Sequence, residues 1–437
     1  MFAQEADRLF KITAHGSTLR REVTAGIVTF ISIAYIIIVN PSILEAAGIP
    51  FEACMIATIL TAAFGCVIMG AYANRPFAVA TYMGENAFVA YTVVGILHFP
   101  WQTALGAVFV SGILLSLLTL SGWRSVMSSA IPTSLKYSFA AGIGLFLAFI
   151  GFIEAGIVVT GSGSVPVEIG QLDNPAVRLA IVGFILTGAL LVRRVKAAIL
   201  LGILGTAGIA FLLGLSPLPT SIVSLPPDLS PTLLQLDIAG VFTVGMFPVI
   251  LSLFTMAFLD TMGSLIGISA RAGFLDNDGN LPQVERPFLA DALATTVGAL
   301  LGTTTNGVFV ESAAGIEQGG RTGLVAVVAG GLFLLALFFS PLFAAIPSLA
   351  TGPVLILVGM MMLEPVTRLD FSDYAEIIPA FSVIAMMSFT YNIGVGMCAG
   401  FVLWPLFAVV RGKIRGIPAA CWALFVLCLS FFLLYPY

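Results

Sequence analysis

The stretch Thr303-Thr304-Thr305-Asn306-Gly307-Val308-Phe309, which continues into Val310-Glu311-Ser312-Ala313, decides the fold of this chain. It sets a short β-prone segment and a carboxyl group within a long apolar region. The same order occurs earlier, where Phe77-Ala78-Val79-Ala80-Thr81-Tyr82 leads into Gly84-Glu85-Asn86-Ala87. Irregular backbone persists at membrane depth only where it is buried in protein or lines a cavity. We therefore predict two short strands, each leading into a half-helix, at the centre of a membrane protein.

The composition of the chain agrees with a membrane location. Of its 437 residues, 59% are hydrophobic and 9% are charged, whereas a soluble domain has roughly 25% charged residues. Apolar runs of about 20 residues, enough to cross a hydrocarbon core, recur along the chain. No basic patch is interleaved with aromatic residues, so nucleic-acid binding is not expected. The cysteines form no CxxC pair and the two histidines lie far apart, so we predict neither a metal site nor a cofactor.

The apolar runs predict an all-α polytopic membrane protein with fourteen spans. The first half contains spans at 23–43, 51–72, 77–97, 101–120, 133–154, 176–192 and 197–214. The second half contains spans at 241–267, 287–302, 305–319, 322–345, 348–363, 373–389 and 393–411. A further apolar run at 418–434 either crosses the membrane or lies along its inner surface, and we favour a crossing.

The positive charges give an independent check of this layout. If residues 1–22 lie in the cytoplasm, all 18 lysines and arginines except Arg178 fall on the inner side, as the positive-inside rule requires. One missed span would reverse the side of every later loop. Because seven spans per half is an odd number, the second half begins on the opposite side from the first. This arrangement is an inverted repeat, which is common in secondary transporters, and we predict an inner (plasma) membrane location.

Three carboxyl groups within the predicted spans are the main candidates for function: Glu85, Asp260 and Glu311. A carboxylate at the bilayer centre costs roughly 2.5–3.5 kcal/mol on insertion scales, so such a group usually faces a cavity or a partner. A carboxyl group that binds a proton on one side and releases it on the other can couple transport to a proton gradient. It can also hydrogen-bond to the edge of a planar heterocycle. We therefore assign all three to substrate binding and proton coupling.

Structural roles remain open for several of these polar residues. Glu85 and Glu311 could instead cap the two half-helices, and Asn86 and Ser312 could be caps or substrate contacts. We interpret Asn40, before Pro41, as a helix terminus.

Other side chains are expected to have no direct part in function. Three acids near predicted membrane edges are expected to be solvated: Glu154, Glu364 and Glu376. Three aromatic side chains could stack on a ring, although most of the 34 phenylalanines should serve packing or face lipid: Phe88, Phe258 and Phe309.

Several longer motifs carry a family resemblance. They are Arg21-Glu22-Val23-Thr24-Ala25-Gly26, Ala34 to Pro41, Asp260-Thr261-Met262-Gly263, Ala290-Asp291-Ala292, Gly302 to Thr305, Val310 to Gly315 and Gly319 to Gly323. With them the chain resembles the nucleobase–ascorbate (nucleobase–cation symporter-2) transporters, in the branch of adenine, guanine and hypoxanthine permeases. The resemblance runs nearly end to end.

The resemblance implies two intertwined seven-helix repeats that form a core domain and a gate domain, often in a homodimer, with an elevator-type movement. It implies that a purine nucleobase, taken up with a proton, lies between the short strands and is held by Asp260, Glu311 and Asn86. The implied division is a core at 23–120 and 241–345 and a gate at 121–214 and 346–416, with an extracytoplasmic loop at 215–240 and an apolar end at 417–437.

The chain departs from this branch at three positions. Gly84-Glu85-Asn86 replaces the usual Gly-Leu-Asn, Ala257 replaces an acid three residues before Asp260, and Val395 replaces an aspartate. We hypothesise that an acid has moved from one span to another within a single pocket, which leaves the preferred purine open. The alternatives are a uracil or xanthine transporter and, on the same architecture, an anion carrier of the sulfate-permease type. An enzyme is not expected, because neither a metal cluster nor a serine–base pair is assembled.

Overall fold

The computed structural model describes residues 2–122, 131–161, 166–219, 221–276 and 281–434. The first half of the described chain contains α1 (Phe2–Phe10), η1 (Thr13–His15), α2 (Leu19–Ile33), α3 (Ile36–Glu45), α4 (Phe51–Ala71), β1 (Val79–Thr81), α5 (Met83–Ala87), the π-helix η2 (Phe88–Ile96), α6 (Trp101–Ser121), α8 (Thr133–Glu154), β2 (Val158–Thr160), β3 (Val167–Ile169), α9 (Pro175–Val192) and α10 (Ala198–Leu212).

The second half contains α11 (Ile238–Val241), η3 (Val244–Met246), α12 (Phe247–Ala272), α13 (Glu285–Leu301), β4 (Asn306–Val308), α14 (Ser312–Glu317), α15 (Leu324–Ala336), η4 (Leu337–Phe339), α16 (Ser340–Ala344), α17 (Ser348–Met361), η5 (Glu364–Arg368), α18 (Tyr374–Phe389), α19 (Ile393–Val410), η6 (Ile414–Gly416) and α20 (Ala419–Leu434).

Within the described residues, nine helices are long and apolar enough to cross a membrane. Three shorter apolar helices, α10, α18 and the larger part of α20, accompany them. The other predicted spans fall on α13 and on two composite segments, β1–α5–η2 and β4–α14. The chain is thus mostly helical and multi-pass, while the count of fourteen crossings remains a prediction.

Local sequence explains where several helices begin. The side chain of Thr18 accepts a hydrogen bond from the Arg21 backbone N–H at the start of α2, and Asn392 does the same for Val395 in α19. Such side-chain oxygens satisfy N–H groups that have no partner within the helix. The first predicted span is not one continuous helix, because α2 ends at Ile33 and α3 begins at Ile36.

Two pairs of strands interrupt the helical structure. Strands β1 and β4, one from each half, pair antiparallel, with Val79 opposite Val308 and Thr81 opposite Asn306. Every residue of both strands is buried. Strands β2 and β3 form a second antiparallel pair, between α8 and α9, that our sequence analysis does not predict. Each of these strands has only three residues, too few for alternating hydrophobicity to mark them.

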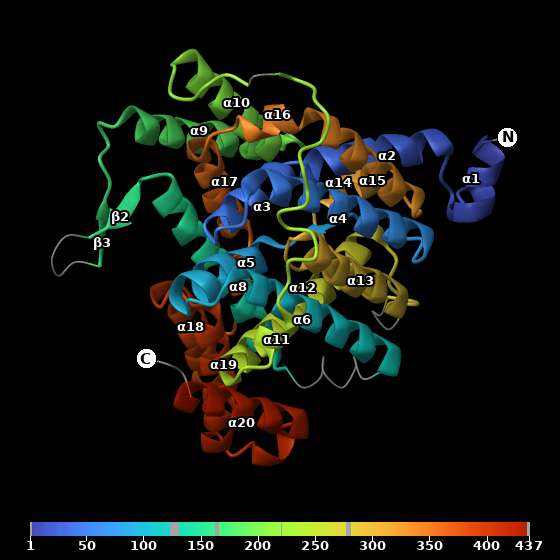
Figure 1. Ribbon diagram of the computed structural model, residues 1–437. Helices are drawn as coiled ribbons and strands as arrows, with labels where there is room; N and C mark the ends of the chain where they lie inside the picture. The colour runs from blue at the N-terminus through green and yellow to red at the C-terminus, as the bar shows by residue number, and fades with distance from the viewer. Residues whose placement is uncertain (1, 123–130, 162–165, 220, 277–280, 435–437) are drawn as a thin grey trace.

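The helices pack in two groups around the first strand pair. In one group α15 packs against α2 and α4, and α13 packs against α4 and α6. In the other, α8 packs against α17 and α18, and α9 packs against α10 and α17. Figure 1 shows α2, α4, α13 and α15 on one side and α8, α9, α17, α18 and α19 on the other. Helix α12 reaches both groups, with contacts to α6 and α13 and to α8 and α19.

The final apolar run forms a helix that packs on its predecessor. Helix α20 contacts α19, and Cys421 is buried near Trp404 and Ala408 of α19. In Figure 1 α20 lies at the end of the molecule beyond α18 and α19. Whether this helix crosses the membrane stays a prediction.

Candidate functional site

The strand pair is fastened to the helix that follows it by one serine. The Ser312 hydroxyl accepts a hydrogen bond from the Ala78 backbone N–H at 2.9 Å and donates one to the Phe309 carbonyl at 2.7 Å. The Phe309 N–H in turn donates to the Ala78 carbonyl at 3.0 Å. Ser312 is fully buried. Its hydroxyl therefore joins β1 to the start of α14, and its assignment as a substrate contact remains a prediction.

Two aromatic rings lie beside the strands. The rings of Tyr82 and Phe309 are nearly parallel, with centroids 6.2 Å apart and an interplanar angle of 12°. The Tyr82 ring lies directly over Gly307, where a Cβ atom would collide with it. All three candidate stacking residues, Phe88, Phe258 and Phe309, are buried in the hydrophobic core. Of these three, Phe309 is the one whose ring lies against Tyr82 beside the strands.

Three carboxyl groups meet close to Tyr82. Glu85 of α5 and Asp260 of α12 face each other closely enough for their carboxyl groups to form a hydrogen bond. Asp291 of α13 lies close enough to Glu85 and Tyr82 to interact with both electrostatically. Glu85 is fully buried, and neither of its carboxyl oxygens meets a donor among the described residues. Among the described residues, no lysine or arginine is an electrostatic partner of these three acids.

Asp291 is a site residue that the sequence analysis did not select. Its Oδ2 accepts a hydrogen bond from the Thr261 hydroxyl, and its Oδ1 is buried with no partner among the described residues. The sequence did contain a signal, because Asp291 is a carboxyl group inside a predicted span. That position carries the same signal as those of Glu85, Asp260 and Glu311.

An open face of α12 continues from Asp260. Gly263 and Gly267 follow Asp260 at helical spacing and so lie on its side of the helix. A Cβ atom built on either glycine would meet no atom within 4 Å. Asp260 itself is partly exposed. Because a carboxyl group avoids lipid, this face is better suited to line an aqueous space than to contact acyl chains.

Glu311 occupies a separate position. It immediately precedes α14, and its Oε1 accepts a hydrogen bond of 2.8 Å from the Tyr35 hydroxyl. Among the described residues, no hydrogen bond joins Glu311 to Asp260 or Glu85. The capping alternative is not observed, because neither α5 nor α14 has a side-chain hydrogen bond at its N-cap. The structure therefore divides the predicted acids between two places.

Asn86 belongs to a buried network of amides and hydroxyls. Its amide N–H donates to Asn40 Oδ1, and its own Oδ1 accepts from the Thr304 hydroxyl. Asn40 donates to Thr58 at 2.6 Å and to Thr303 at 2.9 Å. The interpretation of Asn40 as a helix terminus is wrong, because Asn40 lies within α3 and is fully buried. The network joins both halves of the chain behind the strands.

The expectation that Glu154 is solvated is also wrong. Its Oε1 accepts a hydrogen bond of 2.6 Å from the Tyr91 hydroxyl, and its Oε2 is buried without a partner among the described residues. The Tyr91 ring meets the Tyr391 ring edge-on, with centroids 5.7 Å apart. Thr92 donates to the Tyr391 carbonyl at 3.1 Å. This cluster joins η2 to α8 and to the turn between α18 and α19.

The other two edge acids differ from each other. Glu376 is partly buried and accepts hydrogen bonds from Ser134 at 2.5 Å and from the Trp404 indole at 2.7 Å, so it is not a solvated residue. Glu364 is exposed and pairs with Arg368 at 3.0 Å, in agreement with the expectation.

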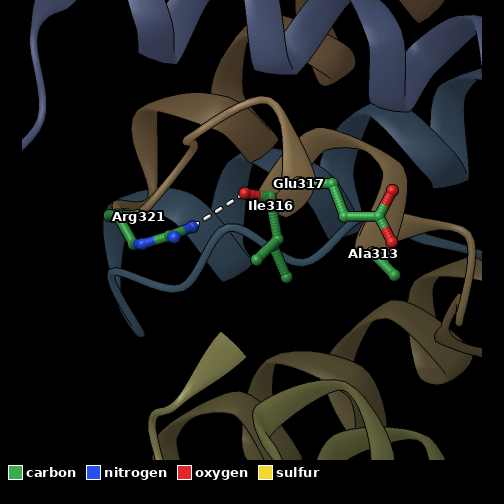
Figure 2. A pocket seen from close by; sticks show the side chains of 4 residues that line it. All are labelled: Ala313, Ile316, Glu317 and Arg321. Carbon is green, nitrogen blue, oxygen red and sulfur yellow. Dashed lines mark hydrogen bonds between the residues drawn. The ribbon is translucent and has the colours of Figure 1, made fainter. Parts of the chain in front are cut away.

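A pocket of about 470 Å³ lies at the end of α14. Figure 2 shows its lining residues, Ala313, Ile316, Glu317 and Arg321. The Arg321 guanidinium donates to the Ile316 carbonyl at 2.8 Å and so closes the end of the helix. The carboxylate of Glu22, near the start of α2, accepts the Arg321 backbone N–H at 2.9 Å. The pocket therefore lies at the end of the molecule where the first span begins.

The architecture is that of solved membrane transporters. The transmembrane domain of a cyanobacterial bicarbonate transporter is similar with a TM-score of 0.63 at 14% identity, over 87% of this chain and 97% of that chain. A murine anion transporter of the solute carrier 26 family, in the inward-facing state, gives a TM-score of 0.64 at 10% identity, over 90% of this chain and 69% of that one. At such identities the similarity defines the fold alone.

Sequence relatives define the family. Residues 20–398 match a family described as a permease family. A putative permease of Methanocaldococcus jannaschii is 44% identical over 100% of this chain and 99% of its own length. An adenine permease of Escherichia coli is 39% identical over 94% of this chain and 92% of its own length. A guanine/hypoxanthine permease of Bacillus subtilis is 39% identical over 97% and 98%. The chain belongs to this permease family, whose members are transporters and not enzymes.

Proposed function

We propose that this chain imports purine nucleobases of the adenine, guanine and hypoxanthine class by symport with protons. The printed names of relatives at 39% identity, an adenine permease and a guanine/hypoxanthine permease, support the substrate class. The observation that carries the proposal is the approach of the buried Glu85 carboxyl group of α5 to the partly exposed Asp260 carboxyl group of α12, beside the paired strands.

This contact supplies a chemical basis for proton coupling. Two ionised carboxylates at contact repel each other strongly, and a proton shared between them turns the repulsion into a hydrogen bond. Glu85 and Asp260 would therefore load a proton as a unit when the site faces the acidic side of the membrane. Release on the other side would restore the repulsion and weaken the site. Asp291 is a third carboxyl group beside this pair, and a negative charge on it would favour the uptake further.

The rest of the site would recognise the planar heterocycle. A carboxylate accepts N–H groups from a ring edge, which suits Glu311. The Phe309 and Tyr82 rings offer apolar faces next to it, and aromatic rings stack favourably on flat ligands. Asn86 and Ser312, although they hydrogen-bond within the chain here, would border the same space.

Transport would proceed by an elevator-type movement of one helix group against the other. We assign residues 23–120 and 241–345 to a core domain and residues 121–214 and 346–416 to a gate domain, in fourteen crossings with inverted symmetry. The N-terminus would be cytoplasmic and the membrane the inner (plasma) membrane, and the chain could act as a homodimer. Packing that is denser within each helix group than between the two groups supports this division.

An anion carrier is the alternative that one observation favours, since the solved structures with this fold include bicarbonate and anion transporters. A binding site for an anion should offer positive groups, as a helix N-terminus or a cation does. Here the site offers four carboxyl groups, those of Glu85, Asp260, Asp291 and Glu311. Among the described residues, no lysine or arginine is an electrostatic partner of Glu85, Asp260 or Asp291. A transporter of uracil or xanthine is the other alternative, and uptake measurements would distinguish it from a purine transporter of the adenine, guanine and hypoxanthine class.

Uptake into proteoliposomes tests these functions directly. Purified chain is reconstituted, and entry of labelled adenine, hypoxanthine and guanine is followed with and without an inward proton gradient. We expect accumulation of at least one purine, driven by the gradient and abolished by a protonophore. Uptake of bicarbonate or sulfate instead would contradict the proposal, and uptake of only uracil or xanthine would change the substrate class.

A further inference from the structure

The first span contains a break at the level of the site. Helix α2 ends at Ile33 and α3 begins at Ile36, and the bonds across the break are short-range. The Ile37 N–H donates to the Ala34 carbonyl, and the Ile38 N–H donates to the Tyr35 carbonyl, each at 3.1 Å. Bonds of this spacing tighten the helix and change the direction of the side chain at the break. Tyr35 occupies that break.

The break aims the Tyr35 hydroxyl at the candidate site. Its side chain is buried, and its O–H donates to Glu311 Oε1 at 2.8 Å. A hydrogen bond to a carboxylate is stronger than one between neutral groups. The bond occupies one oxygen of Glu311 and restricts the rotation of its side chain, while the residue remains partly exposed.

Tyr35 and Glu311 are carried by elements that pack without a gap. Helix α14, which follows Glu311, contacts α2. A Cβ atom on Gly315 would collide with the Thr29 hydroxyl and lie 2.7 Å from the Ala25 carbonyl, so the two backbones are in close contact. The pair is therefore held by direct packing between α14 and α2.

We propose that Tyr35 is a positioning residue for substrate recognition, an inference that rests on the proposed function. By holding Glu311 Oε1, the phenol leaves Oε2 in a fixed orientation for an N–H group of the nucleobase. A carboxylate that is already oriented loses less conformational freedom when the ligand binds. Tyr35 thus acts through Glu311 and does not itself contact the substrate.

A comparison of ligands separates this role from a purely structural one. Equilibrium binding of hypoxanthine and of its 1-, 7- and 9-methyl analogues is measured on purified full-length wild type and Tyr35→Phe. For wild type we expect at least one analogue, which lacks the N–H that Glu311 accepts, to bind much more weakly than hypoxanthine. Tyr35→Phe should bind hypoxanthine about tenfold more weakly than wild type does, since loss of one such hydrogen bond is worth roughly a factor of ten. Its affinity for that analogue should change less than twofold.

The chain offers a matched control in Tyr91, another tyrosine whose hydroxyl donates to a glutamate, Glu154, away from the strands. Tyr91→Phe should leave the preference for hypoxanthine over its methyl analogues unchanged. If Tyr35→Phe lowers all ligands equally, or leaves hypoxanthine binding unchanged, the inference is overturned. If Tyr35→Phe is not recovered folded, Tyr35→His replaces it: a retained wild-type preference supports the inference, and a lost preference contradicts it.

The same assay separates failure of the inference from failure of the proposed function. A wild-type chain that binds none of adenine, guanine and hypoxanthine contradicts the function and the inference with it. A wild-type chain that binds a purine, with a Tyr35→Phe variant of unchanged preference, contradicts only the role of Tyr35.

Discussion

The carboxyl groups of Glu85, which is buried, and Asp260, which is partly exposed, come from different halves of the chain and face each other. Neither Glu85 oxygen has a donor among the described residues, so a proton shared with Asp260 would stabilise this buried carboxyl group. This relationship fits the hypothesis that an acid of span eight, absent at Ala257, is replaced by Glu85 of span three. It also makes the pair the first target for mutation.

Removing the carboxyl group of Glu85 should uncouple transport from the proton gradient. Glu85→Gln keeps the size of the side chain and a hydrogen-bond donor toward Asp260 but cannot exchange a proton. We expect exchange of internal for external purine to continue, while gradient-driven accumulation falls by tenfold or more. Glu85→Leu should lose accumulation in the same way. If Glu85→Leu accumulates purine with wild-type rate and specificity, the hypothesis of the relocated acid is refuted.

Gly307 should be intolerant of even a methyl group. In Gly307→Ala the new Cβ would collide with the Tyr82 ring, and overpacking of this kind costs about 1–3 kcal/mol. We expect a lower melting temperature and little uptake. In a Tyr82→Ala background the collision is absent, so adding Gly307→Ala there should lower the melting temperature much less than it does in wild type. Equal melting temperatures of Gly307→Ala and wild type would contradict the packing described here.

Asn40 should matter for stability. Asn40→Ala leaves the Asn86 amide N–H without its acceptor and removes the donor that Thr58 and Thr303 share, and a buried unsatisfied group costs about 1–3 kcal/mol. Thermal unfolding of the purified chain should show a clear decrease in melting temperature. Ser382→Ala is the control, because that exposed hydroxyl bonds only to its own helix. If the two variants melt alike, the network does not hold the strands.

The pocket at the end of α14 gives a prediction about access. Ala313→Cys, made in a chain whose native cysteines are replaced, should react with a membrane-impermeant thiol reagent applied from the cytoplasmic side. Ala313 lines the pocket, and the pocket lies where the first span begins. Bound purine should slow the reaction if the pocket leads to the site. Reaction only from the outside would reverse the proposed orientation.

Some features of the site could be predicted from sequence because they depend on local residues. The runs that become α4, α6 and α8 are predominantly apolar and about 20 residues long, which is enough to predict a membrane span. The sequence points to Glu85 and Glu311 because a carboxyl group in such a run is rare. Asp291 meets the same criterion.

Other features depend on partners that are distant in sequence. In the sequence Asn40 resembles a helix terminus because Pro41 follows it. In the structure it lies inside α3 and hydrogen-bonds to Thr303 and Asn86. Tyr35 has no local feature that points to Glu311. Glu154 lies at the end of a span, and only the approach of Tyr91 explains its burial. Such contacts arise from the packing of helices and cannot be derived from periodicity.

The pairing of β1 with β4 has a consequence for biosynthesis. A ribosome delivers Val79–Thr81 to the membrane long before it reaches Asn306–Val308, so the backbone of the first strand must wait without its partner. Unpaired backbone groups in hydrocarbon each cost several kcal/mol, and an insertion chaperone or neighbouring helices would have to shelter them. Fragments that end before residue 306 should therefore be degraded, whereas the two halves, produced as separate polypeptides divided within 215–236, should rescue each other.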